Sequence, residues 1–225
     1  MDSVSTAAAV YSLIAACLAI GLVAILHRVE PEFDPSWRML SEYSLGTHGW
    51  LMRVAFMAGG TSVIAVAVAL GNWAWPASLG LVVVACGPLG AAFVDTDPIT
   101  TPRAKMSTRS KIHAAPGSVF ILGFPLAATL AGIAASGDSN IGRDLAWASM
   151  ISWLGIVWFL AATVRFAAPD GRAGPEVQIG WPNRISMLAY LTWVGYAAFT
   201  VVFRSCSERV RSALRSTCAR ADVPI

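Results

Sequence analysis

Residues 50–94 read WLMRVAFMAGGTSVIAVAVALGNWAWPASLGLVVVACGPLGAAFV, two long apolar runs separated only by Gly71 and Asn72. Each run is about as long as the ~20 residues that a helix needs to cross the hydrocarbon core of a bilayer. A helix also satisfies its own backbone hydrogen bonds, which lipid cannot do. Because a two-residue break leaves room only for a tight turn, the stretch predicts an antiparallel hairpin of two transmembrane helices.

Apolar runs of this length recur on both sides of the hairpin. Six spans are expected in all, at about residues 7–26, 50–70, 73–94, 113–135, 145–166 and 185–203. Charged residues make up only 13% of the 225 residues, against about 25% in a soluble domain. The first span is expected to stay as a helix and not to be a signal peptide, because it is long and only Asp2 is charged before it. The sequence therefore predicts an all-α, polytopic membrane bundle.

Polar residues gather in the loops after the first, third and fifth spans, which share one side of the membrane in a six-span bundle. We call this side, formed by residues 27–49, 95–113 and 167–184, the loop face. It holds all three histidines of the chain, His27, His48 and His113. Ten of the sixteen Lys and Arg residues lie on it or near it, so the positive-inside rule predicts a cytoplasmic loop face. The basic residues after Phe203 favour the opposite orientation.

The segment DPSWRMLSEYSLG, residues 34–46, has the start and stop signals of a short helix. Asp34 is the expected N-cap, Pro35 fits the first helical position and Gly46 follows the end. This helix is too short to span, so we expect it to lie at the interface or to fold back over the mouth of the bundle. Glu42 is then either a surface partner of Arg38 or turned inward with Tyr43, since a carboxylate near membrane depth needs a partner or a cavity.

Two further segments bring polar groups to the ends of spans. In FVDTDP (93–98) and KIHAAPG (111–117), Asp95 leaves the third span and His113 enters the fourth, so the two side chains are expected at similar depth. A carboxylate beside an imidazole suits acid–base chemistry; the alternative is a structural clasp, with Asp97 before Pro98 in a turn. In GWPNRI (180–185), Arg184 either reaches lipid headgroups or pairs with carboxylates of the other loops.

We expect one polar cluster where these segments meet. Its candidate catalytic residues are Glu42, Asp95 and His113, and its candidate ligand-binding residues are Tyr43, Asp97 and Arg184. The four cysteines form no CxxC pair and no phosphate-binding or zinc motif is present, so neither a metal nor a cofactor is expected. No basic patch interleaved with aromatic residues suggests a nucleic-acid partner.

The order of these motifs resembles a known family. With SEYSLG, GWLMR, Gly59–Gly60, FVDTDP, KIHAAPG and PNRI, residues 5–203 resemble the bacterial membrane proteins of the domain of unknown function 998 family. The resemblance implies a six-helix bundle in the bacterial inner membrane and family positions at Ser41, Tyr43, Gly46, Asp95 or Asp97, His113 and Arg184. No activity comes with the family name.

Two functions are consistent with this organisation. The first is a non-enzymatic membrane protein that binds a small amphiphile or has a regulatory or permease-like role, in contact with membrane lipids. The alternative is a membrane enzyme that uses carboxylate and histidine acid–base chemistry on a lipid or isoprenoid substrate. In either case residues 1–204 are expected to form the transmembrane domain, and residues 205–225 a basic tail that is disordered or lies on the membrane surface.

Overall fold

The computed structural model of the chain describes residues 2–136, 140–166 and 170–221. The elements are five long helices and two short 3-10 helices: α1 (Ser3–Val29), η1 (Leu40–Leu45), α2 (Gly49–Ala91), η2 (Arg103–Lys105), α3 (Thr108–Ala135), α4 (Asn140–Phe166) and α5 (Gly180–Ala221). Six segments are long and apolar enough to cross a membrane, because α2 supplies two of them, Gly49–Gly71 and Ala74–Ala91. The described residues contain no strand. The prediction of an all-α bundle with six spans is confirmed.

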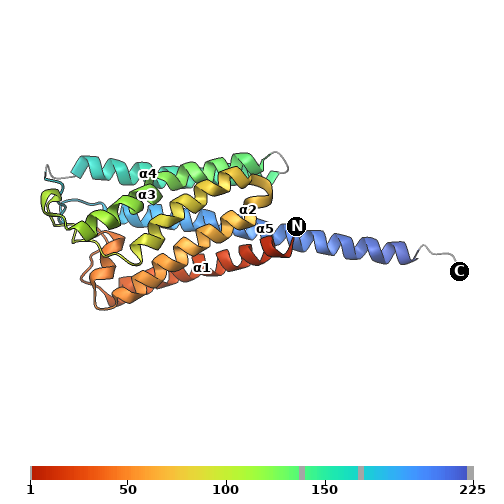
Figure 1. Ribbon diagram of the computed structural model, residues 1–225, viewed down its shortest axis with the longest axis horizontal. Helices are drawn as coiled ribbons and strands as arrows, with labels where there is room; N and C mark the ends of the chain where they lie inside the picture. The colour runs from red at the N-terminus through yellow and green to blue at the C-terminus, as the bar shows by residue number, and fades with distance from the viewer. Residues whose placement is uncertain (1, 137–139, 167–169, 222–225) are drawn as a thin grey trace.

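The predicted hairpin is the two-armed helix α2. Its helical geometry breaks at Ala74, where φ is −143° and ψ is 37°. Figure 1 shows the chain reversing there, so that the two arms of α2 lie side by side. Gly71 and Asn72 still have helical geometry, so the break falls two residues later than the sequence predicts.

Small side chains allow the helices to approach closely. Apart from Leu26, the buried residues of α1 are alanine and serine, including Ala9, Ser12 and Ala16. Ser12 donates a hydrogen bond of 2.8 Å to the carbonyl oxygen of Ser62 in α2, which holds the two helices together. Large residues of α1 such as Ile14, which is 63% exposed, face outward, as expected of a surface in contact with lipid.

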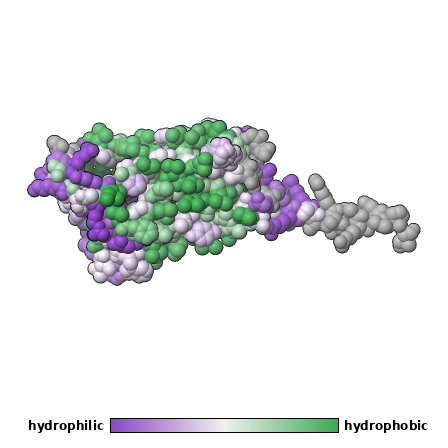
Figure 2. Space-filling view, in the orientation of Figure 1, coloured by the Kyte–Doolittle hydropathy of each residue, from purple (hydrophilic) through white to green (hydrophobic). Residues whose placement is uncertain are grey.

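The loops of the loop face meet at one end of the bundle. Backbone hydrogen bonds join the second loop to the third, from Ala173 to Ile99 and from Arg103 to Asp170, each 2.9 Å long. A third, from Gly180 to Ser36 and 3.1 Å long, joins the start of α5 to the first loop. Hydrophilic residues collect at this end and hydrophobic residues cover the flanks (Figure 2). The expectation that these loops share a side is therefore met in the fold.

The short helix of the first loop differs from its prediction. The carboxylate of Asp34 accepts hydrogen bonds from the backbone and side chain of Ser36, at 2.8 and 2.7 Å, and closes a turn instead of capping a helix. The helix begins at Leu40, has 3-10 geometry and ends at Gly46. Leu40, Glu42 and Tyr43 are buried, so η1 covers the mouth of the bundle.

The helix α5 continues without a break through Ala221. Residues beyond Arg204 therefore extend the last span, and Figure 1 shows this part of α5 projecting past the other helices on the side opposite the loop face. Arg204 and Glu208, one turn apart, form an ion pair of 3.4 Å on it. The basic residues that we assigned to a tail are thus helical as far as residue 221.

Candidate functional site

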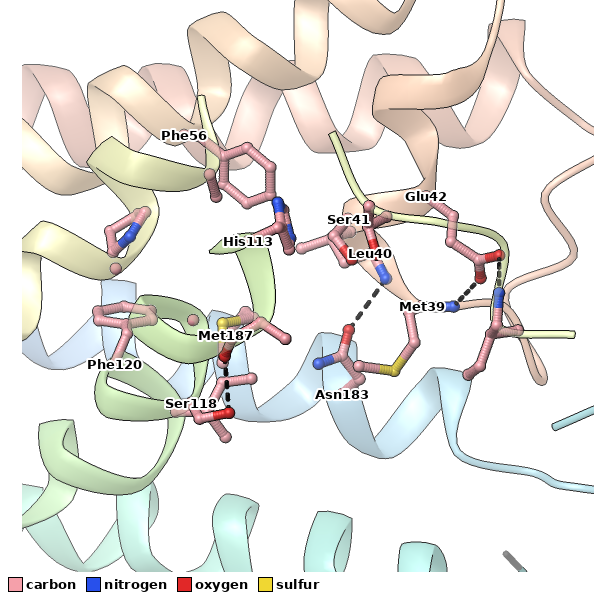
Figure 3. Close-up of a pocket in the computed structure, with 18 of the residues that line it drawn as sticks. Met39, Leu40, Ser41, Glu42, Phe56, His113, Ser118, Phe120, Asn183 and Met187 are labelled. Atoms are coloured by element: carbon pink, nitrogen blue, oxygen red, sulfur yellow. Dashed lines mark hydrogen bonds between the residues drawn. The ribbon is translucent and has the colours of Figure 1, made fainter. Parts of the chain in front are cut away.

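A cavity of about 470 Å³ lies under the loop face, among all five long helices. Its wall is largely apolar, and includes Phe56, Phe120, Ile121, Phe159 and Leu160. Most of its polar residues come from the loops and the adjoining helix ends, and Ser118 lies further along α3: Ser41, Glu42, Thr96, Asp97, Thr101, Ser110, His113, Ser118 and Asn183. Figure 3 shows η1 and the start of α5 on one side of this space and His113 with Phe56 on another. The cavity is therefore amphipathic, with its polar end toward the loops.

Glu42 joins two loops at the polar end. One carboxylate oxygen, Oε1, accepts a hydrogen bond of 2.8 Å from the amide of Ile99, and the other, Oε2, accepts one of 2.7 Å from the amide of Met39. Arg38 lies 3.3 Å from Oε1 as an ion-pair partner. Burial raises the pKa of the Glu42 carboxyl above its usual range, and these hydrogen bonds and the Arg38 charge offset only part of that effect. Glu42 is therefore turned inward, and its ion pair with Arg38 is formed by a buried carboxylate and not at the surface.

Asp97 and His113 also line the cavity, but each is anchored to a neighbouring segment. Asp97 accepts hydrogen bonds from the amide and hydroxyl of Ser107, at 2.6 and 2.9 Å, and so fixes the start of α3. His113 Nδ1 lies 2.6 Å from the carbonyl oxygen of Val94 and must carry a proton to donate to it. In the neutral ring, Nε2 is then an acceptor.

Asp95 does not pair with His113. Its carboxylate forms an ion pair of 2.7 Å with Arg53 of α2, and the histidine bonds the main chain one residue earlier, at Val94. The physical reason is that Arg53 offers a full positive charge to the Asp95 carboxylate. The Nδ1–H group of His113 already donates to the carbonyl oxygen of Val94. Asp95 is not one of the described residues that line the cavity.

Tyr43 and Arg184 form a second group, behind η1. The Arg184 side chain donates to His27 Nε2 at 2.8 Å and to the carbonyl oxygens of Arg38 and Gly180 at 2.6 and 3.2 Å. Its guanidinium lies 5.4 Å from the centre of the buried Tyr43 ring, a cation–π distance. Arg184 therefore holds the first loop against α5 through carbonyl groups and a histidine, and none of the described carboxylates forms an ion pair with it within 4.0 Å.

The predicted single cluster of six residues is thus two groups and one separate residue. Glu42, Asp97 and His113 share the cavity wall, while Tyr43 and Arg184 pack with His27, and Asp95 lies with Arg53. Among the residues with described positions, no group of three or more His, Cys, Asp or Glu side chains is arranged to hold a metal ion.

Two important residues were not singled out from the sequence. Asn183, which is 3% exposed, accepts a hydrogen bond of 3.0 Å from the amide of Leu40 and lines the cavity. Glu30, which is 1% exposed, accepts hydrogen bonds from the amide and the ring of His48 and thereby closes the first loop. Burial raises the pKa of the Glu30 carboxyl, but the hydrogen bonds from His48 and Glu32 and the charge of His48 together outweigh burial and hold the pKa below its usual range. The only sequence signal for Asn183 was its place in PNRI.

Comparison with known proteins gives a family but no activity. The family described as "Protein of unknown function (DUF998)" matches residues 13–200. No curated protein and no solved structure matches the chain. The match covers all six apolar spans in whole or in part, including both arms of α2 and every loop of the loop face. The chain belongs to the DUF998 family, whose function is unknown.

Proposed function

We propose that the protein binds a small amphiphile in the cavity under the loop face. The observation that carries this proposal is the composition of the wall, which is polar at the loop end and apolar along α3 and α4. A molecule with a polar head and an apolar chain matches both parts, and a cavity of about 470 Å³ is within the range of small-molecule sites.

The apolar end of the cavity supports access from the bilayer. Leu122 of α3 and Leu160 of α4 both line it, and both are also exposed, by 53% and 41%. Residues that are exposed on the flank of a bundle face lipid. An amphiphile dissolved in the membrane could therefore enter between α3 and α4 with its chain remaining in apolar surroundings throughout.

Acid–base catalysis on a lipid or isoprenoid substrate has less support from the geometry. Both oxygens of Glu42 already accept backbone hydrogen bonds, which makes the carboxylate a structural link. Asp95 pairs with Arg53. Of the three candidate catalytic residues, only His113 combines a place in the wall with an atom, Nε2, that is free of a bond to a described residue. We therefore favour binding, in a regulatory or permease-like role.

Photoaffinity labelling tests this proposal. The purified protein in phosphatidylcholine nanodiscs is irradiated with two probes that share one diazirine-bearing acyl chain, a monoacylglycerol and a lysophosphatidic acid. We expect at least one probe to label peptides of α3 and α4 that contain Phe120 or Phe159, because these side chains line the apolar wall. Labelling spread evenly over the exposed faces of the helices would contradict the proposal.

A glycine pair supplies the matched variants. Gly117 lines the cavity, and a Cβ atom there meets nothing within 4 Å, so Gly117→Leu is expected to place its side chain in the cavity. Gly21 of α1 has the same free space but does not line the cavity. Gly117→Leu should lose the specific labelling and Gly21→Leu should keep it. Equal labelling of the two variants would overturn the proposed site.

We also propose that the protein lies in the bacterial inner membrane among membrane lipids. In support, its spans are helices, whereas transmembrane proteins of the outer membrane are typically β-barrels. Separation of the two membranes on a density gradient tests this placement. The protein should sediment with the inner membrane, and recovery with the outer membrane would contradict the proposal.

A further inference from the structure

The polar end of the cavity has an unusual charge balance for a lipid-binding site. Its described lining residues include two carboxylates, Glu42 and Asp97, and neither Lys nor Arg. Arg38 forms an ion pair of 3.3 Å with Glu42, but it is not among the described residues that line the cavity. A phosphate head would therefore meet carboxylate oxygens and would find no cation in the wall to pair with.

The two carboxylates are also occupied. Both Glu42 oxygens accept hydrogen bonds from backbone amides, and both Asp97 oxygens accept hydrogen bonds from Ser107. Glu42 has its countercharge in Arg38. A cationic head would consequently have to share carboxylate oxygens that already hold the loops together, so it would gain less from them than from free carboxylates.

The groups left for a ligand are neutral. The Asn183 side chain accepts the hydrogen bond from the Leu40 amide, so the atom that faces Leu40 must be Oδ1. The NH₂ group of Asn183 is then a donor without a described partner. Figure 3 shows this nitrogen turned away from Leu40. Ser41 adds a hydroxyl group to the wall, and His113 adds Nε2, an acceptor in the neutral ring. Together they provide at least two donors and an acceptor.

We infer that the amphiphile has an uncharged, hydroxyl-bearing head, as in a monoacylglycerol or a long-chain alcohol, and is not a phospholipid. This inference rests on the proposed function. A hydroxyl group can accept from the Asn183 amide or the Ser41 hydroxyl and donate to His113 Nε2, so that it pairs with these neutral groups without meeting a charge. The apolar chain then lies along Phe120 and Phe159, toward the opening between α3 and α4.

Competition between matched heads tests the inference. Wild type is labelled with the photoactivatable probe that binds it, in the presence of one of three unlabelled competitors of equal chain length. These are a monoacylglycerol, a lysophosphatidic acid and an alkylamine, and the concentration of each that suppresses labelling is measured. We expect the monoacylglycerol to compete at a concentration at least about tenfold lower than the other two, since a desolvated unpaired charge or a like-charge contact costs more than that ratio represents. Equal or better competition by the lysophosphatidic acid or the amine would overturn the head-group inference but leave the binding site intact. Absence of Gly117-dependent labelling by either probe would instead refute the proposed function, and the inference with it.

Two variants address the head-group residues directly. Asn183→Asp keeps an oxygen for the Leu40 amide but replaces the free NH₂ donor by a negative charge, so it should weaken competition by the monoacylglycerol and strengthen that by the alkylamine. Ser41→Ala, which removes a hydroxyl group from the cavity wall, should weaken competition by the monoacylglycerol without strengthening competition by the alkylamine. Ser44→Ala is the matched control, because Ser44 lies in the same η1 helix outside the wall and donates to the Ser41 carbonyl oxygen. Unchanged head preference in both Asn183→Asp and Ser41→Ala would contradict the inference.

Discussion

The Glu42 carboxylate accepts a hydrogen bond from the backbone amide of Ile99, 57 residues later in the chain, at a distance of 2.8 Å. Through it the first loop is tied to the second, and Ile99 in turn accepts from Ala173 of the third. One buried carboxylate thus closes the loop face over the cavity. The predictions below concern this closure and the cavity that it covers.

Glu42→Gln should destabilise the protein. The two oxygens of Glu42 can both accept, whether or not the carboxyl is protonated, whereas a glutamine side chain has one acceptor oxygen and turns its NH₂ group against a backbone amide donor. We expect a loss of about 2 kcal/mol, the scale of a buried donor left without an acceptor. The loss of stability is measured by thermal unfolding in detergent, with size-exclusion chromatography as the readout of the folded fraction. Glu176→Gln in the third loop changes an exposed residue and is the control; equal melting of both variants would contradict the role of Glu42.

The stabilising effect of Glu42 should depend on pH in a defined direction. Burial raises its pKa, so the folded protein holds the proton more tightly than the unfolded chain does. The contribution of Glu42 to the free energy of unfolding is therefore complete at a pH below 4.5, the ordinary pKa of glutamate. It is lost as the pH rises through the pKa of Glu42 in the folded protein. The advantage of wild type over Glu42→Gln should shrink as the pH increases above 4.5. An advantage that grows with pH would mean that the Arg38 ion pair dominates.

Gly46→Ala should destabilise the first loop. A Cβ atom at this position would collide with the carboxylate of Glu30, which His48 holds in place through two hydrogen bonds. We expect a cost of about 1–3 kcal/mol, as for overpacking in a well-packed interior. The same melting assay applies. Gly21→Ala serves as the control because it meets only open space; similar melting temperatures for the two variants would show that Glu30 moves aside freely.

The second loop should be cytoplasmic. Arg103, Lys105, Arg109 and Lys111 make it the densest cationic loop between spans, which the positive-inside rule places inside the cell. Ala104 is exposed in this loop, so Ala104→Cys is the labelling site, in a background with Cys206 and Cys218 changed to Ser. An impermeant maleimide should label it only after the cells are permeabilised. Labelling in intact cells would reverse the orientation.

The fold was predictable from the sequence because run length alone decides it. Each span is long and apolar enough to be recognised without knowledge of its neighbours, and the Gly71–Asn72 break set the hairpin to within a few residues. Membrane geometry also placed the polar loops together. Gly46 marked the end of η1 correctly, since a glycine there is required by its close approach to Glu30.

The partners within the loop face were not predictable in the same way. Asp95 had both Arg53 and His113 within plausible reach, and the choice depends on how α2 and α3 are rotated, which hydrophobic pattern does not specify. Asp34 used its carboxylate for a turn at Ser36, a local bond that competes with helix capping. Asn183 and Leu40 are 143 residues apart, and only the docking of η1 against α5 brings them together.

Native mass spectrometry tests the binding of an amphiphile in the cavity most directly. Wild type, Gly117→Leu and Gly21→Leu, purified from membranes and released from nanodiscs, are weighed intact, and the bound species is identified after extraction. We predict a one-to-one adduct of an uncharged amphiphile on wild type and on Gly21→Leu, and none on Gly117→Leu, because Gly117 lines the cavity and Gly21 does not. The same adducts on all three proteins, or none on wild type, would contradict the account.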